Sequence, residues 1–307
     1  MDEIRKQFRE MSSWTQLIFL GVFTFAGIIL LNLIVLIAIP FFGLNPTDPI
    51  GLAGSANYIK FILLVQSPLI FLMPACLWSY MFKEKITTGL RINKFPEWQF
   101  LILGIALIFI IQPIVSFTGY YNSKLVLPEA FAPIENMMRS MEDQSAAMLK
   151  PLISDMSVSG LIINLTLIAV MAGICEEFFF RGALQQILRR IIGNYHVTVW
   201  VTAFIFSAIH LQFYGFIPRL ILGALLGYLF VWSANLWVPV IMHTLNNSFS
   251  IIGYHIYGYE IMSSDSNTVF GVGDTWWATA GSGALTIFIM IYLAKLYLRR
   301  SVEEGKI

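Results

Sequence analysis

Three segments of the sequence place polar residues that could do chemistry inside long apolar runs. They are Glu176-Glu177-Phe178-Phe179-Phe180-Arg181, Phe206-Ser207-Ala208-Ile209-His210 and His243-Thr244-Leu245-Asn246-Asn247. A carboxylate can act as a general base for water, and histidine, which titrates near neutrality, can share or shuttle the proton. Imidazole and amide groups can donate hydrogen bonds to the oxyanion of a tetrahedral intermediate. Together these residue types suit hydrolysis by an activated water.

The two adjacent glutamates have different expected roles. Glu177 and Arg181 are four residues apart in the acid-first order that favours an ion pair on a helix. Glu176 points about 100° away from Glu177 on a helix of 3.6 residues per turn. A charged group near the bilayer centre costs at least ~2.5 kcal/mol, so such a residue is a functional candidate by default. We therefore assign Glu176 to the site and Glu177 to the pair with Arg181.

The histidines and asparagines are expected at a depth similar to that of Glu176. At about 1.5 Å per helical residue, Glu176, His210 and Asn247 lie roughly 18–20 Å in from the cytoplasmic ends of their helices. His243 lies one turn shallower and on the same helix face as Asn247. Asn246, three residues from His243, is the alternative to Asn247. The sequence predicts that these side chains meet in one site.

The composition indicates that helices in a membrane must position this site. Hydrophobic residues make up 57% and charged residues 12% of the 307 residues, whereas soluble domains are roughly half apolar and a quarter charged. We predict an all-α, polytopic membrane helix bundle that forms a single integral membrane domain over 1–307. The apolar runs long enough to cross ~30 Å of hydrocarbon predict eight transmembrane helices near 15–40, 60–82, 98–121, 160–188, 197–213, 217–233, 236–256 and 276–297.

The distribution of charge predicts the orientation in the membrane. Lysines and arginines gather before the first run and after the second, fourth and eighth, which all fall on one side of an eight-span bundle. By the positive-inside rule that side is cytoplasmic, so we expect a multi-pass protein of the cell membrane with both termini in the cytoplasm. The net charge of +1 provides no basic surface for nucleic acid. Cys76 and Cys175 are far apart, which excludes a CxxC motif.

The three motifs, Glu-Glu-x-x-x-Arg, Phe-x-x-x-His and His-x-x-x-Asn, occur in this order on successive apolar runs. They resemble the signature of the CPBP family, also called the Abi family, which comprises type II CAAX prenyl endopeptidases and bacteriocin-processing enzymes. The resemblance covers about 160–250. It implies an eight-helix intramembrane protease whose cavity opens to the cytosol and whose substrate is a membrane-associated peptide or protein. By position, it implies that Glu176 and His210 are the water-activating pair and that His243 and Asn247 are the oxyanion-stabilising pair. It implies that Glu177 and Arg181 form a supporting ion pair.

Other functions remain open on the sequence alone. Glu176, His210 and His243 could instead be ligands of a catalytic zinc, because three-ligand zinc sites commonly mix histidine and glutamate. We expect no metal or other cofactor, because the sequence has no HExxH-like pairing. A non-catalytic scaffold or immunity-type protein would retain the fold, and a proton-coupled transporter could use the same residues as a relay. We expect His196 and His255 to be packing or hydrogen-bonding residues.

Overall fold

The computed structural model describes residues 2–258 and 269–303, and every regular element in these ranges is a helix. This confirms the all-α fold class. The chain divides into two compact units. Unit 1 comprises Met1–Asn93, Asp143–Asn194 and His243–Ser264, and unit 2 comprises Lys94–Glu142, Tyr195–Met242 and Asp265–Ile307. The single domain over 1–307 stays a prediction.

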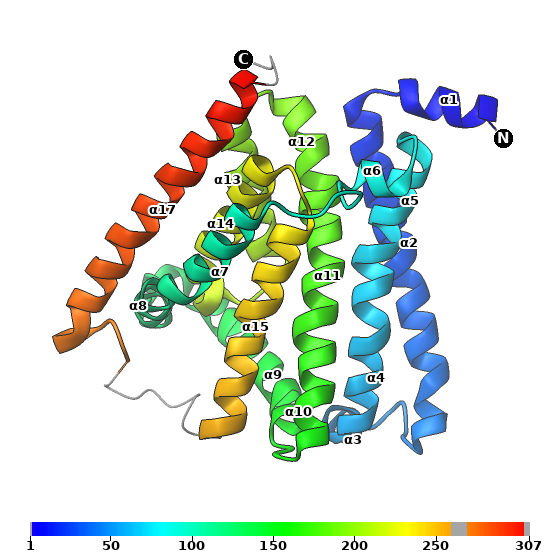
Figure 1. Ribbon diagram of the computed structural model, residues 1–307. Helices are drawn as coiled ribbons and strands as arrows, with labels where there is room; N and C mark the ends of the chain where they lie inside the picture. The colour runs from blue at the N-terminus through cyan, green and yellow to red at the C-terminus, as the bar shows by residue number, and fades with distance from the viewer. Residues whose placement is uncertain (1, 259–268, 304–307) are drawn as a thin grey trace. The chain divides into compact units, whose positions relative to one another are not determined.

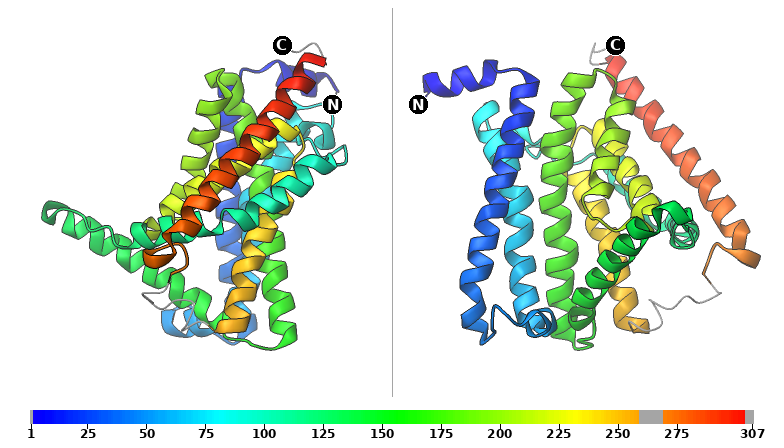
Figure 2. Two further views of the ribbon diagram at one scale, coloured as in Figure 1. Left: turned by 60° about the vertical axis from the view of Figure 1, so that its left-hand side comes forward. Right: turned by 180° about the vertical axis from the view of Figure 1, so that it is seen from behind.

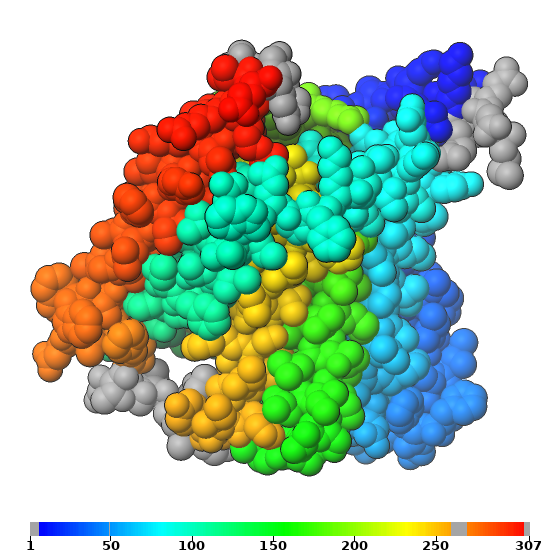
Figure 3. All heavy atoms as spheres, in the orientation of Figure 1, coloured from blue at the N-terminus to red at the C-terminus, as the bar shows by residue number. Residues whose placement is uncertain are grey.

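Unit 1 consists mainly of long helices that run side by side (Figures 1 and 2). Its α-helices are α1 (Asp2–Glu10), α2 (Ser13–Ala38), α3 (Pro49–Gly54), α4 (Ala56–Ser67), α5 (Met73–Phe82), α6 (Ile86–Gly89), α10 (Val158–Asn164), α11 (Ala172–Glu177) and α12 (Gln185–Ile192). Wide π-helical turns at Pro68–Leu72, Leu165–Met171 and Phe178–Leu184 join these into longer rods, α4 with α5 and α10 with α11 and α12. On the face shown in Figure 3, the side chains of α4 and α10 pack against one another.

Close backbone approach and one buried hydrogen bond hold α2 against the α4–α5 rod. A Cβ atom at Gly27 would overlap the carbonyl oxygen of Leu69, so only glycine permits the two helices to lie this close. Near the other end of α2, the buried Trp78 donates its indole N–H to the Gln16 amide oxygen at 3.2 Å. The hydrogen bond satisfies the polar groups of Trp78 and Gln16, which would be costly to bury unpaired in apolar surroundings.

Unit 2 contains the second set of apolar helices, with α17 along α7 and α8 (Figure 1). Its α-helices are α7 (Trp98–Ile110), α8 (Gln112–Ser123), α13 (Tyr195–Ala208), α14 (Phe216–Ser233) and α17 (Trp276–Glu303). Two more helices begin in unit 2 and end in unit 1, namely α9 (Ala132–Ile153) and α15 (Trp237–Tyr257). Helices α13 and α14 pack closely, since a Cβ at Gly223 would lie 3.3 Å from the Cβ of Ala203.

A proline bends the third predicted span. Helices α7 and α8 meet at 42°, and Pro113 lies in the first turn of α8, where it cannot donate a backbone hydrogen bond. The hydroxyl of Ser282 donates to the Ile110 carbonyl, and the hydroxyl of Thr279 is shared between the Gly271 carbonyl at 2.8 Å and the Pro113 carbonyl at 3.3 Å. Helix α17 thus satisfies carbonyl groups at the break, as a bent helix in an apolar medium requires.

Within the described ranges, five helices are long and apolar enough to cross a membrane, or six if the bent pair α7–α8 is one span. Their outward faces are apolar, and Phe288 on α17, for example, is 69% exposed. This pattern fits a multi-pass membrane protein, because lipid rather than water surrounds such a surface. All eight predicted segments contain helix, but α13 has only 14 residues and α15 does not pass the same test. The count of eight therefore stays a prediction.

The sequence analysis did not predict helix α9. Its 22 residues include charged side chains throughout, so it has no apolar run of the kind that identifies a span. Glu135 on this helix accepts a hydrogen bond from the backbone N–H of Leu127 at 2.8 Å and pairs with Arg139 at 2.7 Å. These two interactions hold the pKa of Glu135 below its ordinary value. Local pairs at i and i+4 stabilise such a polar helix.

Candidate active site

The centre of the candidate site in unit 1 is an ion pair on the long rod that includes α11. Arg181 donates from its Nη1 atom to Oε1 of Glu177 at 2.7 Å, and both side chains are completely buried. Their four-residue spacing produces the contact that the sequence pattern indicates. The wide turn Phe178–Leu184 follows Glu177 directly, and such turns occur frequently at functional sites. Each residue neutralises the charge of the other, because a single unpaired charge would be costly in an apolar interior.

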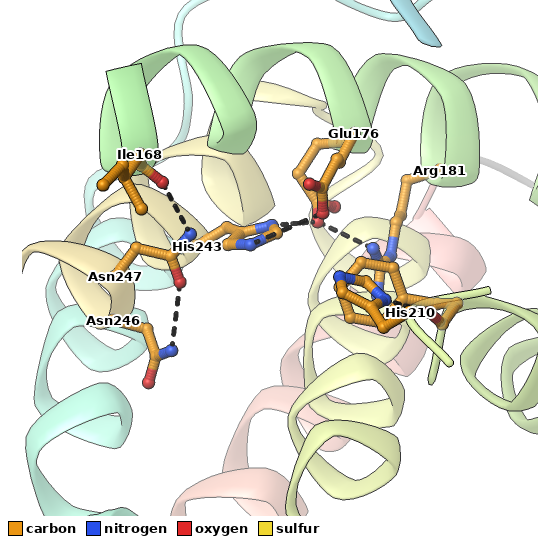
Figure 4. A network of polar contacts seen from close by, with 9 residues as sticks. Ile168, Glu176, Arg181, His210, His243, Asn246 and Asn247 are labelled. Atoms are coloured by element: carbon orange, nitrogen blue, oxygen red, sulfur yellow. Dashed lines mark hydrogen bonds and ion pairs between the residues drawn. The ribbon is translucent and has the colours of Figure 1, made fainter. Parts of the chain in front are cut away.

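His243 on α15 joins the two glutamates (Figure 4). Its Nδ1 atom lies 2.8 Å from the same Oε1 of Glu177, and its Nε2 atom lies 3.9 Å from Oε2 of Glu176. A carboxylate only accepts hydrogen bonds, so the proton of this bond belongs to Nδ1. The Nε2 atom of His243 therefore faces Glu176. The result is a continuous row of Arg181, Glu177, His243 and Glu176.

A glycine allows α11 to come close enough to α15 for these contacts. A Cβ atom at Gly173 would lie 2.5 Å from the hydroxyl oxygen of Thr244 and 3.1 Å from its backbone nitrogen. Gly173 is one helical turn before Glu177, and Thr244 follows His243. The absent side chain therefore lets the Glu177 carboxylate reach the His243 ring. The sequence analysis missed this residue, although an isolated glycine inside a helical pattern often has a packing reason.

Asn247 anchors the other end of the site. Its Nδ2 atom donates to the backbone carbonyl of Ile168 at 3.2 Å, and its Oδ1 atom lies 3.4 Å from Nδ2 of Asn246 (Figure 4). Ile168 belongs to the wide turn Leu165–Met171, where a carbonyl is more accessible to a side chain than in a regular helix. An amide group carries two hydrogens, so the bond to Ile168 leaves one for another acceptor. Asn246 contacts Asn247 and thereby helps to orient its amide.

His210 belongs to unit 2 and lies beyond the end of its helix. The sequence analysis expected the fifth helix to run to residue 213, but α13 ends at Ala208, and Leu211 adopts a left-handed backbone with φ of 54°. The His210 Nδ1 atom lies 2.7 Å from the Phe206 carbonyl oxygen, which can only accept, so Nδ1 carries the proton. Neutral His210 then has its lone pair on Nε2. The convergence of His210 with the unit 1 residues stays a prediction.

Comparison with known proteins supports the reading of these motifs. Residues 158–249 match the Type II CAAX prenyl endopeptidase Rce1-like family. The resemblance found in the three motifs is thereby confirmed for this segment, which is less than a third of the chain. It contains every site residue described above.

A curated relative matches part of the chain. The uncharacterized protein YpbD of Bacillus subtilis (strain 168) is 35% identical over 86 residues. This alignment covers 27% of the chain and 39% of YpbD, so the chain spans about two fifths of the relative that it matches. No solved structure matches the chain.

Three further residues of the apolar segments and their ends have structural environments of their own. Cys175, which precedes Glu176, is buried. The His196 Nδ1 atom lies 3.0 Å from the Tyr228 hydroxyl, and Arg219 donates to the Gln212 amide oxygen at 2.6 Å. Over residues 2–258 and 269–303, no group of three or more His, Cys, Asp or Glu side chains is arranged to hold a metal ion. The absence of a cofactor nevertheless stays a prediction.

Proposed function

We propose that the chain is an intramembrane endopeptidase that hydrolyses a peptide bond of a membrane-associated substrate with water as the nucleophile. The observation that carries the proposal is the row of Arg181, Glu177, His243 and Glu176, at contact distances of 2.7, 2.8 and 3.9 Å. The match of residues 158–249 to the Type II CAAX prenyl endopeptidase Rce1-like family supports the reaction class. It also makes a prenylated CAAX peptide the first substrate to test.

The charges of this row explain how a base and an oxyanion donor can exist together. Arg181 and Glu177 neutralise each other, and His243 and Glu176 share one further proton. When that proton is on His243, Glu176 is a carboxylate and His243 an imidazolium, and the total charge of the row is zero. A neutral network avoids much of the cost of charge in an apolar medium. The state that is ready for catalysis is therefore electrostatically acceptable.

In the proposed reaction, the Glu176 carboxylate accepts a proton from water while the water oxygen bonds to the scissile carbonyl carbon. The oxyanion that forms accepts hydrogen bonds from Nε2–H of His243 and from the second Nδ2 hydrogen of Asn247. Collapse of the intermediate breaks the C–N bond, and the proton held by Glu176 passes to the leaving amine. The products are a carboxylic acid and an amine, and Glu176 returns to its carboxylate form.

His210 has a supporting role in this proposal. Because its Nδ1–H is engaged by Phe206, neutral His210 can accept a proton only at Nε2. We assign it to the water-activating pair with Glu176, where its Nε2 atom can take the water proton from Glu176 and pass it to the leaving amine. The Glu177–Arg181 pair contacts no substrate atom in this scheme and orients His243 through its Nδ1–H bond.

The test measures turnover of a fluorogenic prenylated CAAX peptide by the full chain in proteoliposomes. Glu176→Gln keeps the shape of the side chain and removes the base, so it should abolish cleavage while the protein stays folded. Asn247→Ala should leave measurable activity after a loss of about 10²–10³ in kcat, the usual effect of removing one oxyanion donor. Full activity of Glu176→Gln would remove Glu176 from the mechanism.

Alternative functions give distinct results in the same assay. A zinc protease would lose activity on treatment with a chelator and regain it with one equivalent of zinc, whereas water activation by Glu176 needs no metal. A scaffold or a transporter would cleave no peptide. For these cases, comparison of the membrane peptidomes of cells that carry the wild type and Glu176→Ala would reveal whether any cleaved product depends on Glu176.

A further inference from the structure

The turn that carries His210 in unit 2 has a backbone that leucine rarely adopts. Leu211 has φ of 54° and its side chain is 62% exposed. A non-glycine residue in the left-handed region is held there only when surrounding contacts determine the conformation. Leu211 follows His210 directly, so whatever holds this turn also determines the direction of the imidazole. Apolar burial of Leu211 itself provides little of that restraint.

Asn122 provides a restraint from a different helix. It is the penultimate residue of α8 and its side chain is 1% exposed. Its Nδ2 atom donates to the Phe213 carbonyl at 3.0 Å, and its Oδ1 atom accepts from the backbone N–H of Ile217 at 2.8 Å. The two bonds hold the chain on both sides of the short helical turn Phe213–Gly215. Asn122 therefore connects α8 to the connection between α13 and α14.

A third hydrogen bond closes the same segment from within α13. The buried Ser207 hydroxyl, three residues before His210, donates to the Phe216 carbonyl at 2.7 Å. With these three bonds in place, the ends of the segment that contains His210 are fixed to α13, α14 and α8. His210 then keeps its Nδ1–H bond to Phe206 and its edge-to-face contact with the Phe206 ring, whose centroids are 5.0 Å apart.

We propose that Asn122 is a positioning residue that holds the turn Ile209–Gly215 so that His210 presents Nε2 as its proton acceptor. This proposal rests on the role of His210 in the proposed function. The side-chain chemistry fits the task, because only an amide of this length offers a donor to Phe213 and an acceptor to Ile217 at once. Aspartate would retain the acceptor and lose the donor. Alanine would lose both and release the turn.

The expected effects follow from the release of Leu211. Without Asn122 the backbone at Leu211 relaxes out of the left-handed region, His210 rotates, and its i,i−4 ring bond to Phe206 is lost. Asn122→Ala should lower kcat by about 100-fold, because a displacement of about 1 Å at a catalytic group has this effect. KM should change little, since Asn122 contacts no substrate in this proposal. In the His210→Ala background the same change should have no additional effect on the residual rate.

The experiment compares Asn122→Ala with Thr118→Ala, a matched control on the same helix whose hydroxyl bonds to the Ile114 and Val115 carbonyls of α8 itself. Both variants are assayed with the prenylated CAAX peptide, alone and combined with His210→Ala. Nitrogen-15 shifts of ring-labelled histidine in nanodiscs report which His210 nitrogen carries the proton. We expect the Nδ1–H form in the wild type and in Thr118→Ala, and a mixture of both forms in Asn122→Ala.

The two measurements separate failure of this inference from failure of the proposed function. If His210→Ala is fully active, or the wild type cleaves no peptide, the proposed function is wrong, and the nitrogen-15 shifts still decide whether Asn122 positions His210. An unchanged His210 tautomer in folded Asn122→Ala would overturn the inference. The kinetic comparison gives a second test. If Asn122→Ala lowers kcat by the same factor in the wild type and in the His210→Ala variant, the inference is also overturned, because Asn122 would then act without His210.

Discussion

Replacement of Arg181 by alanine should destabilise the folded chain by about 3 kcal/mol. The change leaves the Glu177 carboxylate completely buried without the cation that lies 2.7 Å from it. Removal of one partner from a buried ion pair typically costs about 3–5 kcal/mol. We expect the lower end of this range, because the His243 Nδ1–H bond to the same oxygen, at 2.8 Å, remains.

The chain offers a matched control for this prediction. Arg139 and Glu135 have the same acid-first spacing and the same distance of 2.7 Å, but the Arg139 side chain is 46% exposed. Exposed pairs contribute about 1 kcal/mol or less, so Arg139→Ala should cost no more than that. The double variant Glu177→Gln with Arg181→Met removes both buried charges. It should be more stable than Arg181→Ala, because no isolated carboxylate is left.

Reversible unfolding in mixed micelles, followed by the fluorescence of the eight tryptophans, measures these differences. Activity towards the CAAX peptide is recorded for each variant, because the double variant also removes the partner of His243 and should be slow although it is stable. If Arg181→Ala costs no more stability than Arg139→Ala, the buried pair does not have the energetic role argued here.

Three further predictions concern packing, pH and orientation. Gly173→Ala should lower both stability and turnover, because the new Cβ would lie 2.5 Å from the Thr244 hydroxyl oxygen. Adding Thr244→Ala removes that oxygen and should restore part of each. Equal activity of Gly173→Ala and wild type would contradict this prediction. Hydrogen bonds from Ser157 hold the pKa of Asp155 below its ordinary value, so its contribution to stability is complete above the unfolded pKa and is lost as the pH falls through the lowered value. In unfolding experiments from pH 6 downward, Asp155→Asn should therefore be less stable than wild type at pH 6 and equally stable at the acid end. In a background without native cysteines, a cysteine introduced at the exposed position of Thr88 should react with a membrane-impermeant reagent only from the cytoplasmic side. Labelling from the outside alone would show that the predicted topology is wrong.

The sequence was sufficient to predict the helices of the membrane region, because apolar runs in lipid must satisfy their own backbone hydrogen bonds. Each of the eight predicted segments contains helix in the described structure. The Glu177–Arg181 contact was equally predictable, since a helix fixes which residues are neighbours at i and i+4. Helix α9 was not, because its interactions are the Glu135–Arg139 ion pair and the hydrogen bond from the Leu127 backbone N–H to Glu135, and it has no apolar run.

Only the tertiary structure decided which groups His243 and Asn247 contact. His243 meets Glu177 across 66 residues of sequence, and Asn247 meets the Ile168 carbonyl across 79. Neither partner follows from helical periodicity, because each depends on the depth and rotation at which two separate helices pack. Gly173 sets that packing through the absence of a side chain. In the same way, Asn122 reaches the turn of His210 from 91 residues away. The sequence therefore determined the types of polar residue and the contact within one helix, whereas the contacts between helices depended on the tertiary structure.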